Sequence, residues 1–342
     1  MKKFTLYILT AFGLMGLATS CNDFGDVNND PMNLNPGVVD YKMEFTQVEA
    51  QICGSDWDVW RNGCIYTANM IQHTASVDWA YGVFYTWNDQ YSGAYWGGFY
   101  SGGRAAIRNI IDVMNNWEGN PAYANEYQMC RILKAYMFQN MTDLYGDVPY
   151  SEAGQGYSTN PIPYPKYDTQ EAIYNDLLKE LDEAQAALST SAGNTIGAAD
   201  VIYNGDAAKW KKFANSLMLR VAMRLTKVAP DKAKTWVAKA VSNGLFVSND
   251  DNAIVRHTNG SPSDDSAEPY GKVFSSLDTQ AFYISETFIN ILQDDPRLPL
   301  IATVCTRDPK PGWGDADFDL GDNTAAKQKG MPVGYDVSGG DW

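Results

Sequence analysis

The chain has 342 residues, and 45% of them are hydrophobic, which is enough to bury the core of one large domain or of two closely packed ones. Its 26 basic and 41 acidic residues give a formal net charge of −15 at pH 7. Because this charge repels a phosphate backbone, we expect no nucleic-acid partner.

The N-terminus has the pattern of an export signal. Lys2 and Lys3 precede an apolar stretch from Phe4 to Leu17 that is too short to span a bilayer. The residues from Ala18 to Cys21 resemble a lipobox, in which the cysteine is acylated after cleavage, although the aliphatic Leu17 stands one place earlier than usual. We therefore predict a signal peptide at residues 1–20 and lipidation of Cys21, with palmitate among the acyl chains. The alternative is an ordinary secretory signal cleaved nearby.

Residues 21–37 are predicted to be a flexible tether, because the stretch from Asn22 to Pro36 is rich in Asn, Asp, Pro and Gly and cannot build a core. Residues 38–342 form the predicted folded domain. Two helical stretches open it, at about Val39 to Cys53 and about Asp56 to Thr74.

An aromatic segment follows between positions 79 and 100, in which ten rings alternate with Asp, Asn and Gln. Sugar rings pack their C–H faces on aromatic planes, and their hydroxyls need carboxylate and amide partners, so this mixture suits a carbohydrate-binding surface. Trp79, Tyr81, Trp87 and Asn88 flank glycines or polar residues and are the candidate ligand-binding residues. The alternative is that most of these rings belong to the core.

Gly102 and Gly103 separate the aromatic segment from a helix that runs to about Trp117. The next helix is predicted from about Pro121 to Leu144, with proline in the first turn, where a helix tolerates it. Its apolar residues recur every three or four positions and define one stripe, made of Cys130, Leu133, Met137, Met141 and Leu144.

A proline-rich loop from Val148 to Pro165 leads to Asp168, a predicted helix cap with an acid three residues on, at Glu171. The helix it opens has an apolar face made of Ile173, Leu177, Leu181, Ala184 and Leu188. Two more helices follow, at about Asp206 to Thr226, with Trp210, Phe213, Leu217, Val221 and Leu225, and at about Asp231 to Ser242.

Helices of this length joined by short loops indicate antiparallel hairpins, so the fold class is predicted to be mainly α, with long irregular loops. After Asn249 the chain becomes rich in Gly, Pro, Asp and Asn, with one further helix expected from about Asp278 to Gln293. Beyond Pro296 we expect loop with short strands.

The remaining cysteines are Cys53, Cys64, Cys130 and Cys305, and none forms a CxxC pair, so zinc ribbons and thioredoxin-like redox chemistry are unsupported. Export would permit a Cys53 to Cys64 disulfide, but buried free thiols are the favoured interpretation.

Several long motifs occur in one order along the chain. These are TDLYGDVPYSEA, from Thr142 to Ala153, then YDTQEAIY, from Tyr167 to Tyr174, and KWKKFANSL, from Lys209 to Leu217. With Asn28 to Pro31 and Asp295 to Leu298, they make the chain resemble the SusD/RagB-like nutrient-binding lipoproteins.

The resemblance implies a scaffold of tetratricopeptide-like hairpins, lipid-anchored at the cell surface in the outer membrane. It also implies a SusC-like TonB-dependent transporter as partner and a glycan or other nutrient as ligand. Members of this family usually continue further, so this chain is expected to be short at its C-terminus, which ends at Trp342.

Other chemistry finds little support in the residues. The acidic run from Asp315 to Asp322 would suit calcium, but its glycine is one place late for an EF-hand and Ala326 replaces the closing glutamate, so we expect a solvated loop and no metal. Adjacent carboxylates such as Asp294 and Asp295 usually diverge and are weak indicators of a glycosidase. We therefore expect a binding protein without cofactor rather than an enzyme, the alternatives being a surface glycoside hydrolase and a structural or adhesive lipoprotein.

Overall fold

The computed structural model describes residues 39–76, 78–101, 106–157, 160–257, 268–273, 282–304 and 321–335. Contacts divide the chain between Tyr41 and Lys42, and the account below concerns the part from Lys42 onwards. The predicted signal peptide, the tether with Cys21, Cys305 and most of the acidic run at 315–322 lie outside the described residues.

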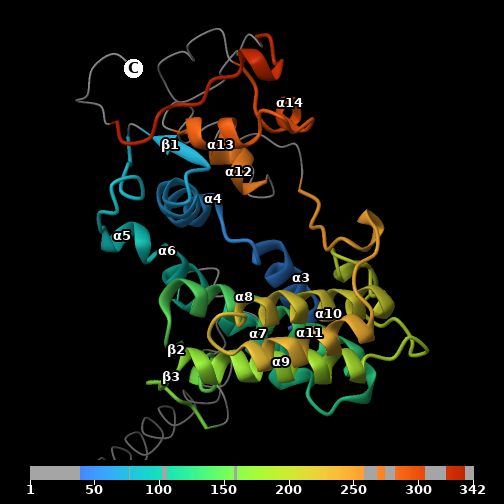
Figure 1. The fold of residues 1–342 in the computed structure, drawn as a ribbon. Helices are drawn as coiled ribbons and strands as arrows, with labels where there is room; N and C mark the ends of the chain where they lie inside the picture. Colours follow the sequence, from blue (N-terminus) through green and yellow to red (C-terminus); the bar gives the residue numbers. More distant parts are fainter. Residues whose placement is uncertain are drawn as a thin grey trace, which may run out of the picture. The chain divides into compact units, whose positions relative to one another are not determined.

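Five helices form the main helical body, and each packs on the next along the chain from α7 to α11 (Figure 1). Arg131 of α8 contacts Glu180 of α9, whereas Asp143 near the end of α8 contacts Tyr174 near the start of α9, so the two helices are antiparallel. This confirms the predicted helical hairpins and the mainly α fold. The five helices are α7 (Ala106–Trp117), α8 (Ala124–Tyr145), α9 (Gln170–Ala187), α10 (Ala207–Arg224) and α11 (Pro230–Asn243).

The ends of these helices follow from local sequence. Helix α8 ends at Gly146, whose positive φ of 74° suits a residue without a Cβ. Helix α9 is capped by Thr169, whose hydroxyl accepts from the backbone N–H of Ala172 at 3.3 Å. The cap is therefore not Asp168 as predicted, because that carboxylate accepts two hydrogen bonds from Ser151 in the preceding loop.

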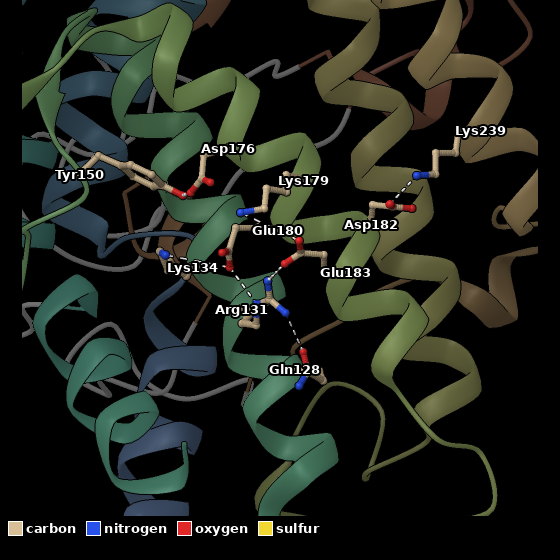
Figure 2. Close-up of polar contacts among 10 residues, drawn as sticks. All are labelled: Gln128, Arg131, Lys134, Tyr150, Asp176, Lys179, Glu180, Asp182, Glu183 and Lys239. Atoms are coloured by element: carbon tan, nitrogen blue, oxygen red, sulfur yellow. Dashed lines mark hydrogen bonds and ion pairs between the residues drawn. The ribbon is translucent and has the colours of Figure 1, made fainter. Parts of the chain in front are cut away.

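Charged side chains link α8, α9 and α11 on one side of this body, as Figure 2 shows. Arg131 donates to Glu180 at 2.9 Å and to Glu183 at 2.6 Å, and Lys239 pairs with Asp182. The side chain of Arg131 is only 13% exposed, so its pairs are less screened by water than ordinary surface ion pairs. These pairs favour one register of the hairpin.

The apolar stripes lie in the core as predicted, with two exceptions, Leu144 and Phe213. Leu144 is 37% exposed, because it lies in the last turn of α8, just before the chain leaves the helix at Gly146. Phe213 is half-buried. The predicted residues that are buried are Cys130, Leu133, Met137, Met141, Ile173, Leu177, Leu181, Ala184, Leu188, Trp210, Leu217, Val221 and Leu225.

Two short antiparallel sheets correct the predicted elements. β1 (Thr74–Ser76) pairs with β4 (Phe282–Ile284), so the helices predicted to reach Thr74 and to span Asp278 to Gln293 are wrong at these positions. Sequence periodicity cannot reveal a strand whose partner lies about two hundred residues away. The second sheet joins β2 (Val148–Pro149) to β3 (Tyr167–Asp168).

Shorter elements complete the described part of the chain. Helix α13 begins after Ser285, whose hydroxyl accepts from the N–H of Phe288 at 3.0 Å. Helix α14 lies beyond Pro296, where we predicted loop and short strands. These elements are α3 (Tyr41–Gln51), α4 (Asp56–Asp58), α5 (Asp89–Ser92), α6 (Ala94–Trp96), α12 (Pro269–Lys272), α13 (Glu286–Ile291), α14 (Leu298–Ile301), the π-helices η1 (Val59–Ala68) and η2 (Gly97–Ser101), and the 3₁₀ turns Pro121–Tyr123, Gln155–Tyr157, Gly197–Ala199, Asn249–Asp251 and Ala325–Lys327.

None of the cysteines inside the described residues is disulfide-bonded, so Cys53 and Cys64 do not form a disulfide. Cys64 and Cys130 are buried thiols as predicted, whereas Cys53 is exposed.

Candidate ligand-binding site

The site begins on the helical segment formed by α4 and η1. Ser55 caps it, because its hydroxyl accepts from the N–H of Asp58 while the Asp58 carboxylate accepts from the N–H of Ser55. Trp57, Trp60 and Arg61 follow at three- and four-residue spacing, which puts them on one side of the helical segment.

A loop from Trp79 to Thr86 lies directly on η1, and Gly82 makes this approach possible. Its N–H donates to the carbonyl of Ile65 at 3.1 Å. A Cβ at Gly82 would lie 2.5 Å from the Ile65 carbonyl oxygen and 2.7 Å from that of Tyr66, closer than any side chain tolerates. The loop therefore needs glycine at this position to bring Trp79 and Tyr81 against the helical segment.

Asn62 fixes the next segment against η1. Its amide N–H donates to the carbonyl of Ser92 at 3.0 Å, and its amide oxygen accepts from the N–H of Tyr95 at 3.1 Å. The side chain of Asn62 is buried, so both contacts are shielded from water. They hold α5 and α6 where Tyr91 reaches the tryptophans.

Five rings then meet in one assembly, which we call the aromatic cluster: Trp57, Trp60, Trp79, Tyr81 and Tyr91. Trp60 is its centre, with ring centroids 5.5 Å from Trp57, 5.2 Å from Trp79 and 5.7 Å from Tyr91, all edge to face. Tyr81 completes it at 5.5 Å from Tyr91. Edge-to-face pairs at this spacing are favourable and hold the rings in fixed orientations.

The aromatic cluster is buried at its centre and open around it. Trp60 is 8% exposed, whereas Trp57 is 44% and Trp79 is 38% exposed, and Tyr81 and Tyr91 are half-buried. The Tyr91 hydroxyl is neutral near pH 7, as an ordinary phenol is, and burial raises its pKa further. Fixed rings with open faces are what the C–H surface of a sugar ring requires.

Arg61 adds hydrogen-bond donors to the aromatic cluster. Its guanidinium carbon lies 5.2 Å from the centroid of Trp57 and 5.9 Å from that of Tyr91, within cation–π range. Within the described residues its buried Nε has no hydrogen-bond partner. Because Arg61 is half-buried, the guanidinium N–H groups other than the buried Nε are the donors that it can offer to a ligand oxygen.

The four residues predicted from sequence separate into two groups. Trp79 and Tyr81 belong to the aromatic cluster. Trp87 is 74% exposed and donates its indole N–H to the Asp89 carboxylate, and among the described residues it makes no ring contact with the aromatic cluster. Asn88 caps α5 by accepting from the N–H of Tyr91 at 3.3 Å. Its amide oxygen therefore has a structural role.

Sequence reasoning missed Trp57, Trp60 and Arg61. The signal was present, as two tryptophans three residues apart inside a predicted helix, but helical spacing alone does not separate a core stripe from an open one. The rings between 79 and 100 are of three kinds. Phe99 is buried, Trp79, Phe84, Tyr85 and Trp87 are exposed, and the others are half-buried, with Tyr81 and Tyr91 packed against a core cluster.

The described residues also include a groove that lies away from the aromatic cluster. It has a volume of about 700 Å³ and lies at the ends of α8, α9, α10 and α11, with Asp143, Arg224 and Lys232 in its lining, and Tyr174 is the only ring that lines it. No group of three or more His, Cys, Asp or Glu side chains in the described part of the chain is placed to hold a metal ion. None of the described helices is both long enough and apolar enough to cross a bilayer.

Comparison with known proteins agrees with the fold. No curated protein matches the sequence. A solved chitin-binding protein is 30% identical, with a TM-score of 0.69 over 87% of this chain and 61% of its own. A structure described as Bacteroidetes AC2a SusD-like is 32% identical, with a TM-score of 0.65 over 76% of this chain and 50% of its own. A chitin-binding SusD homolog from Flavobacterium johnsoniae is 25% identical, with a TM-score of 0.65 over 87% of this chain and 58% of its own.

The chain thus spans between half and two thirds of the length of these relatives. Residues 39–336 match the SusD-like family described as "Starch-binding associating with outer membrane". Because that match covers nearly all of the described fold, and because the solved relatives share its helical architecture, the chain belongs to the SusD-like family.

Proposed function

We propose that this protein binds an oligosaccharide at the aromatic cluster. The observation that supports this most directly is the pair of half-open tryptophans, Trp57 and Trp79, held in fixed orientations around the buried Trp60. Rings that are already ordered lose little conformational entropy when a sugar stacks on them. The ligand is assigned to the glycans because their C–H faces match such rings and their hydroxyls match the polar groups beside them.

Arg61 and the Tyr91 hydroxyl supply donors to ligand oxygens in this proposal. Trp87 and Asn88, from the adjoining segment, extend the contact surface beyond the rings. The exposed face of Trp87 offers a second stacking position. Since two solved relatives are described as chitin-binding and the family as starch-binding, chitin and starch oligosaccharides are the first ligands to test.

We place the protein among binding proteins rather than hydrolases. Asp56 and Asp58 flank Trp57, Asp78 precedes Trp79, and Asp89 lies two residues before Tyr91. Three of these carboxylates already have partners, since Asp56 pairs with Lys272, Asp58 accepts from Ser55 and Asp89 accepts from Trp87. A glycosidase needs two carboxyl groups facing each other across the scissile bond. Incubation of purified protein with labelled oligosaccharides tests this directly, because release of shorter sugars would favour the hydrolase alternative.

We further propose that the protein is anchored by lipid on Cys21 at the cell surface and passes its ligand to a SusC-like TonB-dependent transporter. Family membership and the printed association with the outer membrane support this location. Co-purification of a barrel protein from detergent-solubilised outer membranes would support the transporter as partner. Its absence, with cell adhesion lost in a deletion strain, would favour the adhesive alternative.

Calorimetric titration with chitin and starch oligosaccharides tests the binding site. Trp79→Ala should weaken binding by about 1 to 3 kcal/mol, the scale of an aromatic contact. Trp236→Ala is the matched control, because this tryptophan lies on α11 and its described contact is with Lys239. Equal losses in both variants, or retained affinity in Trp79→Ala, would reject the aromatic cluster as the site.

A further inference from the structure

One face of α3 is attached to the loop at residues 195–205 that precedes α10. Lys42 and Thr46 donate to two carbonyl oxygens of this loop, at 2.8 and 2.6 Å. One turn further along the helix, Glu49 Oε2 accepts from the N–H of Val201 at 2.8 Å. Three side chains at helical spacing therefore bind the same loop.

Asp200 organises the loop from within. Its Oδ1 accepts from the N–H groups of Ile202 and Tyr203, at 3.0 and 2.9 Å. Its Oδ2 accepts from the N–H of Gly205 and the indole N–H of Trp210, both at 2.7 Å. Because four N–H groups donate to this carboxyl group, both of its oxygens act as acceptors. Asp200 is only 1% exposed.

Glu49 is the second carboxyl group at this place, and it is fully buried. Its Oε1 receives no hydrogen bond within the described part of the chain. Burial, and then the neighbouring Asp200 carboxylate with a hydrogen bond between the two carboxyls, raise the pKa of Glu49 to about 10. Two adjacent buried carboxylates repel each other strongly, and the four N–H donors that surround Asp200 leave Glu49 as the carboxyl group that keeps the proton.

We propose that Glu49 is a neutral carboxylic acid that shares its proton with Asp200, and that this proton is the latch holding α3 on the loop at residues 195–205. The Oε1 atom carries the proton and donates it to Asp200, while Oε2 accepts from Val201. Loss of the proton to water leaves two adjacent buried carboxylates, whose repulsion releases the helix.

Other ionisable groups near Glu49 and Asp200 lie on α8 and α3. From α8, the Cys130 thiol is buried, and burial together with Glu49 and Glu126 raises its pKa, so it stays a neutral thiol and adds no charge. The pKa of Glu126 is also raised, by burial first, while the backbone N–H groups of the loop and Lys42 act in the opposite direction. Lys42 is the cation on the same face of α3, and it is seven residues, two helical turns, from Glu49.

The latch has a consequence for the aromatic cluster. Four residues, Ile52 to Ser55, separate α3 from α4, which together with η1 carries Trp57 and Trp60. Release of α3 would free the chain immediately before these rings.

The pH dependence of stability follows from the protonation of Glu49 in the two states. The native state binds the proton up to a pH of about 10, whereas an unfolded glutamate loses it near its ordinary pKa of 4.5. Stability from this group is therefore complete below about pH 4.5 and declines as pH rises through 10.

Denaturant unfolding of the full chain at a series of pH values tests the latch, with wild type compared to Glu49→Gln. Glutamine keeps the acceptor for Val201 and offers an N–H to Asp200, but it has no proton to lose. The folding equilibrium constant of wild type should fall relative to that of the variant by close to tenfold per pH unit between pH 6 and 9. Glu171→Gln, an exposed glutamate on α9, should run parallel to wild type. Parallel profiles for Glu49→Gln would overturn the proposal.

Hydrogen exchange in the wild type keeps the proposal testable if the variant fails to fold. After correction for the intrinsic rate, protection of the Val201 N–H should fall with rising pH. The N–H of Ile173, bonded to Thr169 in the first turn of α9, should lose protection only as far as it exchanges through global unfolding. A pH-independent protection factor at Val201 would show that no proton is linked to this contact and would equally overturn the proposal.

Discussion

Trp79 meets Trp60 edge to face, with ring centroids 5.2 Å apart and planes inclined by 77°. The two rings have opposite environments, since Trp60 is 8% and Trp79 is 38% exposed. Trp60 supports the aromatic cluster from within, whereas Trp79 has an exposed ring face. Replacing Trp60 should therefore affect stability, and replacing Trp79 should affect ligand binding.

Trp60→Ala should lower the free energy of unfolding by about 3 to 5 kcal/mol, the usual cost of removing a buried aromatic side chain. Trp79→Ala should leave the melting temperature near that of wild type while reducing oligosaccharide affinity. Thermal melts and calorimetric titration on both variants separate the two roles. A large melting-temperature loss in Trp79→Ala, with affinity retained by the folded fraction, would make Trp79 a core residue.

Gly82→Ala should displace the loop that carries Trp79 and Tyr81, because a methyl group there would lie 2.5 Å from a backbone oxygen of η1. We expect a stability loss of about 1 to 3 kcal/mol, as for other overpacked positions, together with weaker ligand binding. Gly97→Ala is the control, since a Cβ at that glycine meets no atom within 4 Å. Equal behaviour of the two variants in melts and titrations would contradict the close-approach argument.

Leu177→Ala and Leu217→Ala should each cost about 2 to 5 kcal/mol, because both side chains are buried between the packed helices α8, α9 and α10. Val228, which is 81% exposed, provides the control as Val228→Ala. Chemical denaturation measures all three. Losses below 1 kcal/mol at both leucines would mean that these helix faces are not part of the core.

The Arg131 pairs in Figure 2 predict loss of stability in acid. The hydrogen bond from Arg131 and the charges of Arg131 and Lys134 lower the pKa of Glu180, against the effect of burial. A folded-state pKa below the unfolded one means that the stabilisation is present above about pH 4.5 and is lost as pH falls through the folded value. Glu180→Gln should therefore have a lower free energy of unfolding than wild type at pH 7. Its free energy of unfolding should also decline less steeply between about pH 5 and 3. A decline as steep as that of wild type would argue against this pair as its source.

Cys21→Ser should leave the fold intact and abolish membrane attachment, because the cysteine is proposed to act only through its acyl chains. Fractionation of cells, with and without detergent, measures the attachment. Cys53→Ser, at an exposed free cysteine, is the matched control and should remain in the membrane fraction. A serine variant at position 21 that still requires detergent for release would refute lipid anchoring through this residue.

Helices α8, α9 and α10 could be predicted from sequence because each buries a stripe of apolar residues at three- and four-residue spacing, and this spacing is a local property. Leu177 and Leu217 were placed in the core for this reason and are buried there. The family motifs from Thr142 to Leu217 lie in the same part of the chain and predicted the same architecture.

The two sheets and the aromatic cluster are formed by contacts between residues that lie far apart in the sequence. β1 is a strand only because β4, about two hundred residues further along, supplies its hydrogen-bond partners. Trp57, Trp60 and Arg61 share a site with Trp79 only because Gly82 lets a loop lie against η1. Local spacing predicts which side chains share a face of a helix, but only tertiary packing determines which of those faces is covered and which remains open to a ligand.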